Sequence, residues 1–425
     1  MTTSRERINQ AIAHVEPDKV PLDLGASATT GMHVSSVYLI RQALGLDEPG
    51  TPVKVIEPYQ MLGEIAPDLQ NLLGIDVVGV SGTRNFFGFR NEGWKPWQLW
   101  DGTPVLVPAD FNTEPEENGD ILMYPEGDRS APPSGKMPFG GFYFDTIVRQ
   151  PAFDDEHLDV IDNLEEFGPI TNQELEHFRN EVNRIWETTD KAILGNFGGT
   201  SFGDIALVPV PQLKYPKGIR DIAEWYISTS VRRSYVYRVF ERQCEIALEN
   251  LEKIFGVTGN RITAVFVSGT DFGTQQGPFI SPKTYRELYK PFHIEINRWI
   301  HTHTTWKTLI HSCGSIVKLI PDFLDAGFDI LNPVQVSAAG MDAADLKEKY
   351  GDAITFWGGG VDTQHTLPEG TPESIRSEVR ERMRIFGKGG GFVFNAIHNI
   401  QPRIPKENLV ALFDAVQEFR NYPVA

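Results

Sequence analysis

Short apolar runs rich in β-branched residues recur along the chain, and each is followed by small or polar residues and then by a stretch with helical spacing. The runs cover residues 75–80, 192–195, 262–267, 306–310, 328–331, 354–357 and 392–394. Amphipathic stretches follow the later runs, at 282–302, 316–326, 343–350, 372–386 and 406–420. Continuous apolar runs of this length are typical of strands that are buried on both faces, as in a parallel sheet covered by helices. The alternation therefore predicts an α/β fold, a (β/α)₈ TIM barrel.

The start of the chain fits the same barrel. Ser4 can cap a short helix whose apolar residues recur at helical spacing, and Pro17 ends it before an extended segment at 20–22. A doubly wound open sheet is the alternative fold, and it is usually marked by an early glycine-rich turn that opens a helix. The glycine triplets at 358–360 and 389–391 lack the G-x-G-x-x-G form. We therefore interpret both triplets as structural turns.

Residues 84–150 interrupt the alternation. An Asp101-Gly102 pair lies between two apolar segments, 97–100 and 105–107, and this pattern predicts a β-hairpin. The segment 123–136 is rich in proline, glycine and charge. We therefore expect residues 1–425 to form one barrel domain with a β-rich insertion at 84–150, which would serve as a lid or an oligomer contact.

Composition and charge narrow the function classes. The balance of 39 basic and 57 acidic residues gives a net charge of −18, which repels polyanions and argues against a nucleic-acid partner. No apolar stretch approaches the roughly 20 residues that span a bilayer. The first nine residues are polar and the chain has only two cysteines, so we expect a cytoplasmic protein without a disulfide framework.

One of these cysteines lies in a His311-Ser312-Cys313 sequence at the end of a predicted strand. Residues i and i+2 of a strand point to the same face, so an imidazole and a thiolate can bind one metal ion there. Zinc accepts nitrogen and sulfur ligands and keeps an open position in catalytic sites. The alternative is a buried thiol beside a hydrogen-bonded histidine. His398, which follows the last predicted strand, is the best candidate for a third ligand.

Polar residues also follow other predicted strands, where the reactive groups of a barrel are found. Asp271, Gln335 and Asp362 are the candidates for catalytic or substrate-orienting roles. Each has a structural alternative, because Asp271 and Asp362 can equally cap turns and Gln335 can simply line a loop. A small-molecule substrate bound at these strand ends is expected.

Four sequence segments resemble the uroporphyrinogen decarboxylase superfamily, which includes cobalamin-linked methyltransferases. They are RER at 5–7 with PDKVP at 17–21, GPFISP at 277–282, DAGFDILN at 325–332 and PKEN at 405–408. The resemblance spans most of the chain apart from the insertion and implies a TIM barrel. In the methyltransferase branch, a His-x-Cys pair and a distant Cys bind zinc. His311 and Cys313 match the pair, whereas the distant position falls on His398.

The resemblance implies a zinc-dependent methyl or alkyl transferase that moves a methyl group between a corrinoid protein and a thiol or similar acceptor. The cobalamin would be carried by a separate corrinoid protein, because the chain has no Asp-x-His-x-x-Gly motif. Barrels of this kind commonly form dimers, so a homodimer is expected.

Two other functions remain open. A decarboxylase acting on a carboxylated substrate is the main alternative, although residues 24–30 contain none of the arginines with which true uroporphyrinogen decarboxylases grip their substrate. A non-catalytic partner of a corrinoid demethylation system is the other.

Overall fold

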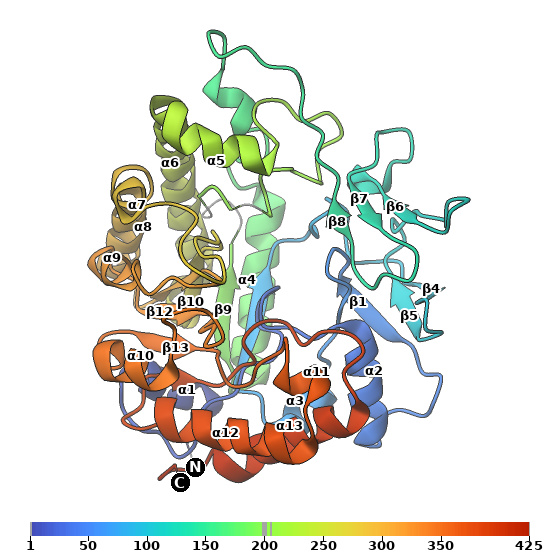
Figure 1. The fold of residues 1–425 in the computed structure, drawn as a ribbon, viewed down its shortest axis with the longest axis vertical. Coiled ribbons are helices and arrows are strands. Elements are labelled where there is room, and N and C mark those ends of the chain that lie inside the picture. Colours follow the sequence, from blue (N-terminus) through green and yellow to red (C-terminus); the bar gives the residue numbers. More distant parts are fainter. Residues whose placement is uncertain (1, 198–201, 205, 425) are drawn as a thin grey trace.

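A curved sheet of parallel strands forms the centre of the protein, as seen in this computed structural model, which describes residues 2–197, 202–204 and 206–424 (Figure 1). Its strand order is β14-β13-β12-β11-β10-β9-β3. The bounds are β3 (Val77–Ser81), β9 (Ala192–Asn196), β10 (Ala264–Ser268), β11 (Lys307–His311), β12 (Ile330–Asn332), β13 (Thr355–Trp357) and β14 (Phe392–Val393). All six pairings between neighbours are parallel.

Residues 20–23 close this sheet into a barrel. The backbone N–H of Phe394 donates to Pro21 and the N–H of Asp23 donates back to Phe394, so this segment pairs with the strand at one edge. At the other edge the N–H of Asp76 donates to the carbonyl of Leu22. The extended segment expected near the start of the chain therefore fills the eighth position, and the predicted (β/α)₈ barrel is confirmed.

Helices cover the outside of the barrel (Figure 1). They are α1 (Ser4–Ile12), α2 (Val34–Ala43), α3 (Pro67–Leu73), α4 (Asn172–Thr188), α5 (Ile222–Val231), α6 (Arg233–Thr258), α7 (Pro282–Leu288), α8 (Lys290–His303), α9 (Ile320–Asp325), α10 (Ala343–Tyr350), α11 (Thr366–Glu369), α12 (Pro372–Phe386) and α13 (Lys406–Phe419). Within the described residues, no helix combines the length and apolar character needed to cross a membrane.

Prolines change two of the helices expected from the sequence. The stretch 282–302 divides into α7 and α8 at Tyr289, because Pro291 has no N–H to donate and its ring opposes a continuous helix. The stretch 316–326 becomes helical only at Ile320, directly before Pro321, since proline is well tolerated in a first turn.

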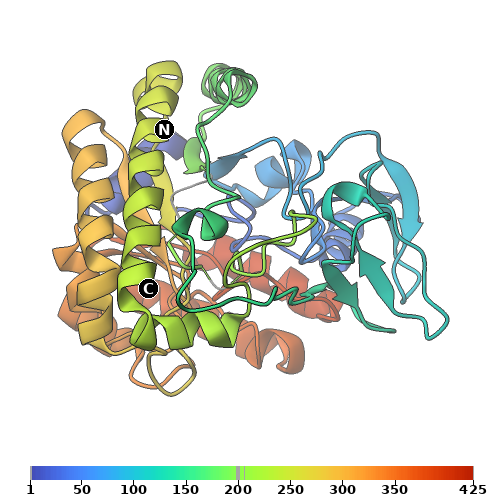
Figure 2. The same cartoon turned by 90° about the horizontal axis from the view of Figure 1, so that it is seen from above.

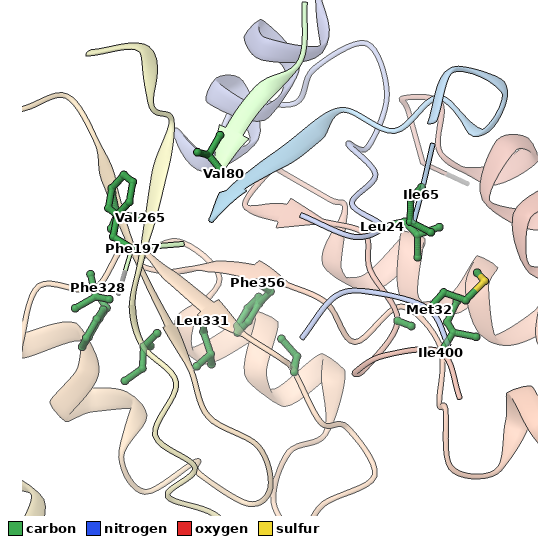
Figure 3. Packing of buried hydrophobic residues seen from close by; sticks show 14 of the residues in the cluster. Leu24, Met32, Ile65, Val80, Phe197, Val265, Phe328, Leu331, Phe356 and Ile400 are labelled. Atoms are coloured by element: carbon green, nitrogen blue, oxygen red, sulfur yellow. The ribbon is translucent and has the colours of Figure 1, made fainter. Parts of the chain in front are cut away.

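The buried apolar residues form two clusters, one inside the barrel and one outside it. The inner cluster combines alternate strand residues, among them Leu309 and Ile330, with Ile8 and Ile12 of α1, which covers one end of the barrel. The outer cluster lies between strands and helices and includes Leu331 and Phe356 (Figure 3). Because strand side chains alternate, residues two beyond those of the inner cluster also point inward, at the open end.

The insertion contains five strands: β4 (Lys95–Gln98), β5 (Pro104–Val107), β6 (Ile121–Met123), β7 (Gly135–Met137) and β8 (Asp145–Thr146). The hairpin expected at Asp101-Gly102 joins β4 and β5 in antiparallel pairing. Two strands from before the insertion, β1 (Val53–Glu57) and β2 (Leu62–Gly63), extend that hairpin into a four-stranded sheet. Figure 2 shows these strands on the opposite side of the molecule from α6 and α8.

Candidate metal centre

His311, Cys313 and His398 meet at the open end of the barrel. One ligand atom from each residue lies within 4.8 Å of the others, and Cys313 Sγ is 3.4 Å from His311 Nε2. His311 is the last residue of β11, and His398 follows β14 in the chain. The rings of the two histidines meet edge to face, with their centroids 5.5 Å apart. Two strand ends that are distant in sequence thus supply one nitrogen- and sulfur-rich cluster.

A hydrogen bond determines which nitrogen of His311 faces this cluster. His311 Nδ1 is 2.6 Å from Asn332 Oδ1, and Asn332 Nδ2 donates to the carbonyl of Trp357 at 2.7 Å. Because the amide nitrogen of Asn332 is used as a donor, its oxygen must accept, and His311 Nδ1 carries the proton. The lone pair on Nε2 therefore points toward Cys313.

The loop that carries Cys313 is fixed by neighbouring loops. The backbone N–H of Cys313 donates to Asp271 Oδ1 and that of Gly314 donates to Gln335 Oε1, both at 2.7 Å. Gln335 Nε2 in turn donates to Gln275 Oε1 at 2.6 Å. Gly314 has a positive φ of 83° and packs directly on Gly273, where a side chain would collide with backbone atoms.

Asp271 is the carboxylate beside the trio. Its Oδ1 lies 3.7 Å from His311 Nε2, and its backbone carbonyl accepts from the hydroxyl of Tyr226 at 2.9 Å. A second carboxyl, Asp204, lies close by in the loop after β9. Burial and, next, the charge of Asp271 raise the pKa of Asp204 to about 7. This side of the site is therefore acidic.

Burial keeps two of the three ligands neutral when no cation is bound. Burial and the Asp271 charge raise the pKa of the Cys313 thiol well above its usual value. Burial and the neighbouring His311 lower the pKa of His398 to about 4. A bound cation would replace the thiol proton, as metal binding to cysteine does in general.

The residues predicted for catalysis occupy different places. Asp271 touches the trio, and Gln335 holds the Cys313 loop from outside. Asp362 caps its own turn, because Oδ1 accepts from the N–H of Gln364 at 2.7 Å and Oδ2 lies 3.2 Å from His365 Nδ1. Their catalytic roles stay predictions.

Two residues near the site were missed by the sequence reasoning. Asn332 ends β12 and pairs in register with His311, so its position at a strand end was the available signal. Asp204 has no comparable signal, because it lies within a long loop and not at the end of a strand.

The second half of the chain is similar to a known protein family. Residues 239–419 match the model of the uroporphyrinogen decarboxylase (URO-D) family. The matched stretch runs from α6 to α13 and includes His311, Cys313 and His398. The resemblance inferred from the sequence motifs is thereby confirmed at the level of the superfamily.

Curated relatives match over a shorter stretch. Uroporphyrinogen decarboxylase from Pseudoalteromonas translucida is 36% identical over 93 residues, which cover 20% of this chain and 25% of that protein. The enzyme of the same name from Methylococcus capsulatus is 33% identical over 95 residues, covering 22% of this chain and 25% of that protein. The chain thus spans about a quarter of the length of these relatives.

One solved structure matches nearly the whole chain. A methyltransferase from Methanosarcina mazei covers 99% of this chain, with 99% of its own length included, at a TM-score of 0.55 and 16% sequence identity. At this identity the match establishes a shared fold.

Proposed function

We propose that this protein is a zinc-dependent methyl or alkyl transferase that moves a methyl group between a corrinoid protein and a thiol or similar acceptor. The observation that carries the proposal is the convergence of His311, Cys313 and His398 at the open end of the barrel. The fold shared with a methyltransferase from Methanosarcina mazei supports it.

The donor set suits zinc. Zinc bonds to nitrogen and sulfur of about 2.0 to 2.3 Å place the ligands of a tetrahedral site about 3.3 to 3.8 Å apart. The 3.4 Å between Cys313 Sγ and His311 Nε2 falls in this range, and the other pairs of ligand atoms exceed it by at most about 1 Å. Three protein ligands leave a fourth position for a substrate. Zinc bound there would supply Lewis acidity, which lowers the pKa of an acceptor thiol.

The chain's own residues prepare the site. Asn332 holds the proton on His311 Nδ1 and so keeps Nε2 available to a metal. Asp271 fixes the backbone of Cys313 and brings a negative charge next to the ligands. The cobalamin would arrive on a separate corrinoid protein, which makes that protein a proposed partner.

Metal analysis tests the proposal. Purified protein should contain about one zinc per chain, and Cys313→Ser should lose most of it because a hydroxyl is a weak zinc ligand. Cys244→Ser makes the same change in α6, where Cys244 is buried, and should retain zinc. Methyl transfer from methylcobalamin to a thiol should disappear together with the zinc. A wild-type protein that takes up no zinc would exclude this function.

A decarboxylase is the second candidate function, favoured by the names of the curated relatives. It predicts release of carbon dioxide from a carboxylated substrate that continues after chelation. The loop at 24–30 lies beside the trio, since Thr29 Oγ1 donates to Asn332 Oδ1 at 3.3 Å, and it contains no arginine to bind a polycarboxylate.

A further inference from the structure

A cavity of about 200 Å³ lies where the insertion meets the open end of the barrel. Its walls come from four parts of the chain: His33 directly before α2, the turn from β1 into β2, residues 143–145 of the insertion, and residues 399–402 after the last strand. The volume suits a small organic molecule.

Asn399 joins this cavity to the metal centre. It lines the cavity and directly follows His398. Its Nδ2 donates to Gln60 Oε1 and to the carbonyl of Ala28, both at 2.7 Å, and its Oδ1 accepts from the N–H of Gly31 at 2.6 Å. The amide is therefore fully used in tying the cavity wall to the segment that carries the third ligand.

The charge of the cavity is negative. Asp145 is the charged residue among the described residues that line it, and neither lysine nor arginine lines it. His33 donates from Nε2 to the carbonyl of Phe142 at 2.8 Å, and burial lowers its pKa to about 4, so it is neutral at pH 7.

Two cationic side chains close to the cavity, one in the insertion and one after its lining residue Pro402, are engaged elsewhere. Lys136, which pairs with Asp145 along the β7–β8 ladder, forms an ion pair with Asp120 at 3.0 Å. Arg403 lies 4.7 Å over the ring of Phe142 and contacts the carbonyl of Gly140. Among the described residues, no lysine, arginine or histidine forms an ion pair with the carboxylate of Asp145.

Aromatic rings make up much of the remaining wall. Tyr59, Tyr143 and Phe144 line the cavity, and Tyr59 is fixed by stacking on Phe86 with the ring centroids 4.5 Å apart. The faces of aromatic rings attract cations, also at exposed positions such as that of Tyr143. An anion would find no lysine or arginine among the described residues of this wall, whereas an organic cation would find a carboxylate and several rings.

We propose that this cavity binds the ammonium group of an organic cation that is the acceptor substrate of the proposed methyl transfer. The inference rests on the proposed function, because it assigns to that reaction a substrate held by the segment that directly follows His398. The net charge of −18 favours approach of a cation over longer distances.

Calorimetric titration of the zinc-loaded full chain tests the charge preference. Benzyltrimethylammonium is the cationic probe, phenylacetate the anionic one and benzyl alcohol the neutral one. We expect the cation to bind at least tenfold more tightly than either of the others at low salt. Equal or tighter binding of phenylacetate or benzyl alcohol, or no binding of the cation, would overturn the inference.

Variants at one carboxylate assign the binding to the cavity. Asp145→Asn should weaken binding of benzyltrimethylammonium about tenfold or more, whereas Asp145→Glu, which keeps the charge, should stay within threefold. Glu117→Gln removes the same charge from an exposed part of the insertion that does not line the cavity, and should leave binding unchanged. Equal affinities in Asp145→Asn and the wild type would refute the role of the carboxylate.

The two proposals can fail separately. Zinc content is measured on every preparation, and the titration is repeated after chelation, because no cavity wall residue is a proposed ligand. Cation binding in a chain that does not bind zinc would refute the transferase proposal and support the cation site alone. A chain that contains zinc but does not bind benzyltrimethylammonium would refute the cavity proposal alone.

Discussion

At the scale of single residues, one amide decides the chemistry of the candidate metal centre. His311 has two ring nitrogens, and only Nε2 faces Cys313. Asn332 holds the proton on Nδ1 because its own amide nitrogen donates to the carbonyl of Trp357. Fixing the tautomer in this way is the usual means by which outer hydrogen bonds strengthen a histidine ligand.

Replacement of this amide should weaken zinc binding without removing a ligand. We expect Asn332→Leu to lower zinc affinity about 10- to 100-fold, since the His311 ring loses both its orientation and its fixed tautomer. Asn332→Asp keeps an oxygen acceptor and should retain affinity within about threefold. Competition with a fluorescent chelator measures both. Unchanged affinity in Asn332→Leu would show that packing alone orients the ring.

At the scale of elements, the ends of the strands are shaped by loops that pack on one another. Gly314 follows Cys313 and lies against Gly273 of the loop after β10, where an added Cβ would come within 2.5 Å of backbone atoms. The position also needs a positive φ. Contact between two backbones is thus part of what places the Cys313 thiol.

A methyl group at this contact should be costly. We expect Gly314→Ala to lower the free energy of unfolding by at least about 2 kcal/mol, from backbone strain plus the collision with Gly273. Gly45 has a similar φ of 70° but open space around it, so Gly45→Ala should show the strain alone, about 1 kcal/mol. Urea unfolding compares the two, and equal losses would mean that the collision is relieved without cost.

A carboxylate between elements makes stability depend on pH. Asp329, just before β12, accepts from His301 Nε2 at 2.7 Å and from the N–H of Thr308 at 2.8 Å. Burial alone would raise the pKa of Asp329, but these hydrogen bonds outweigh it and lower the pKa below 3.8. Its stabilisation is therefore present above the unfolded pKa and is lost as the pH falls through the folded pKa.

The matching variant should lose this dependence. We expect Asp329→Asn to lower the free energy of unfolding by about 1 to 2 kcal/mol at pH 7, because hydrogen bonds to a charged acceptor are lost. The difference from the wild type should shrink as the pH falls below about 4. Denaturant unfolding at several pH values measures it, and a gap that stays constant down to pH 3 would contradict the explanation.

At the scale of the whole molecule, buried ion pairs connect the N-terminal and C-terminal helices where the barrel closes. Asp76, directly before β3, binds Arg7 of α1 and Arg420, which follows α13, and also accepts from the N–H of Leu22. Arg420 further donates to the carbonyls of Val20 and Gly74. One buried carboxylate thus connects the first and last helices with the segment that fills the eighth barrel position.

Removing that carboxylate should destabilise the whole fold. We expect Asp76→Ala to cost about 3 to 5 kcal/mol, because Arg420 would be left buried without its counter-charge and Arg7 would keep only Asp18. Asp414 is exposed on α13, and Asp414→Ala should change stability by less than about 0.5 kcal/mol. Thermal unfolding followed by circular dichroism compares the variants. A loss in Asp76→Ala no larger than in the control would show that water replaces the network.

The alternation of apolar runs and amphipathic stretches was enough to predict the barrel, because strands buried on both faces and helices buried on one leave different periods in the sequence. The same logic placed His311, Cys313 and His398 at strand ends. It did not predict the division of 282–302 into two helices. The amphipathic pattern continues across Pro291, so periodicity alone shows no break there.

By itself the sequence determined the barrel, the end of the barrel at which the polar residues gather, and the kind of ligand that each strand end offers, since these follow from local periodicity. Only the tertiary structure decided that Asn332 fixes the tautomer of His311, that Asp204 comes close to Asp271, and that the insertion and the segment after the last strand line one cavity. Such contacts join residues far apart in the chain. Their distances depend on how whole elements pack, and no local pattern of residues encodes that packing.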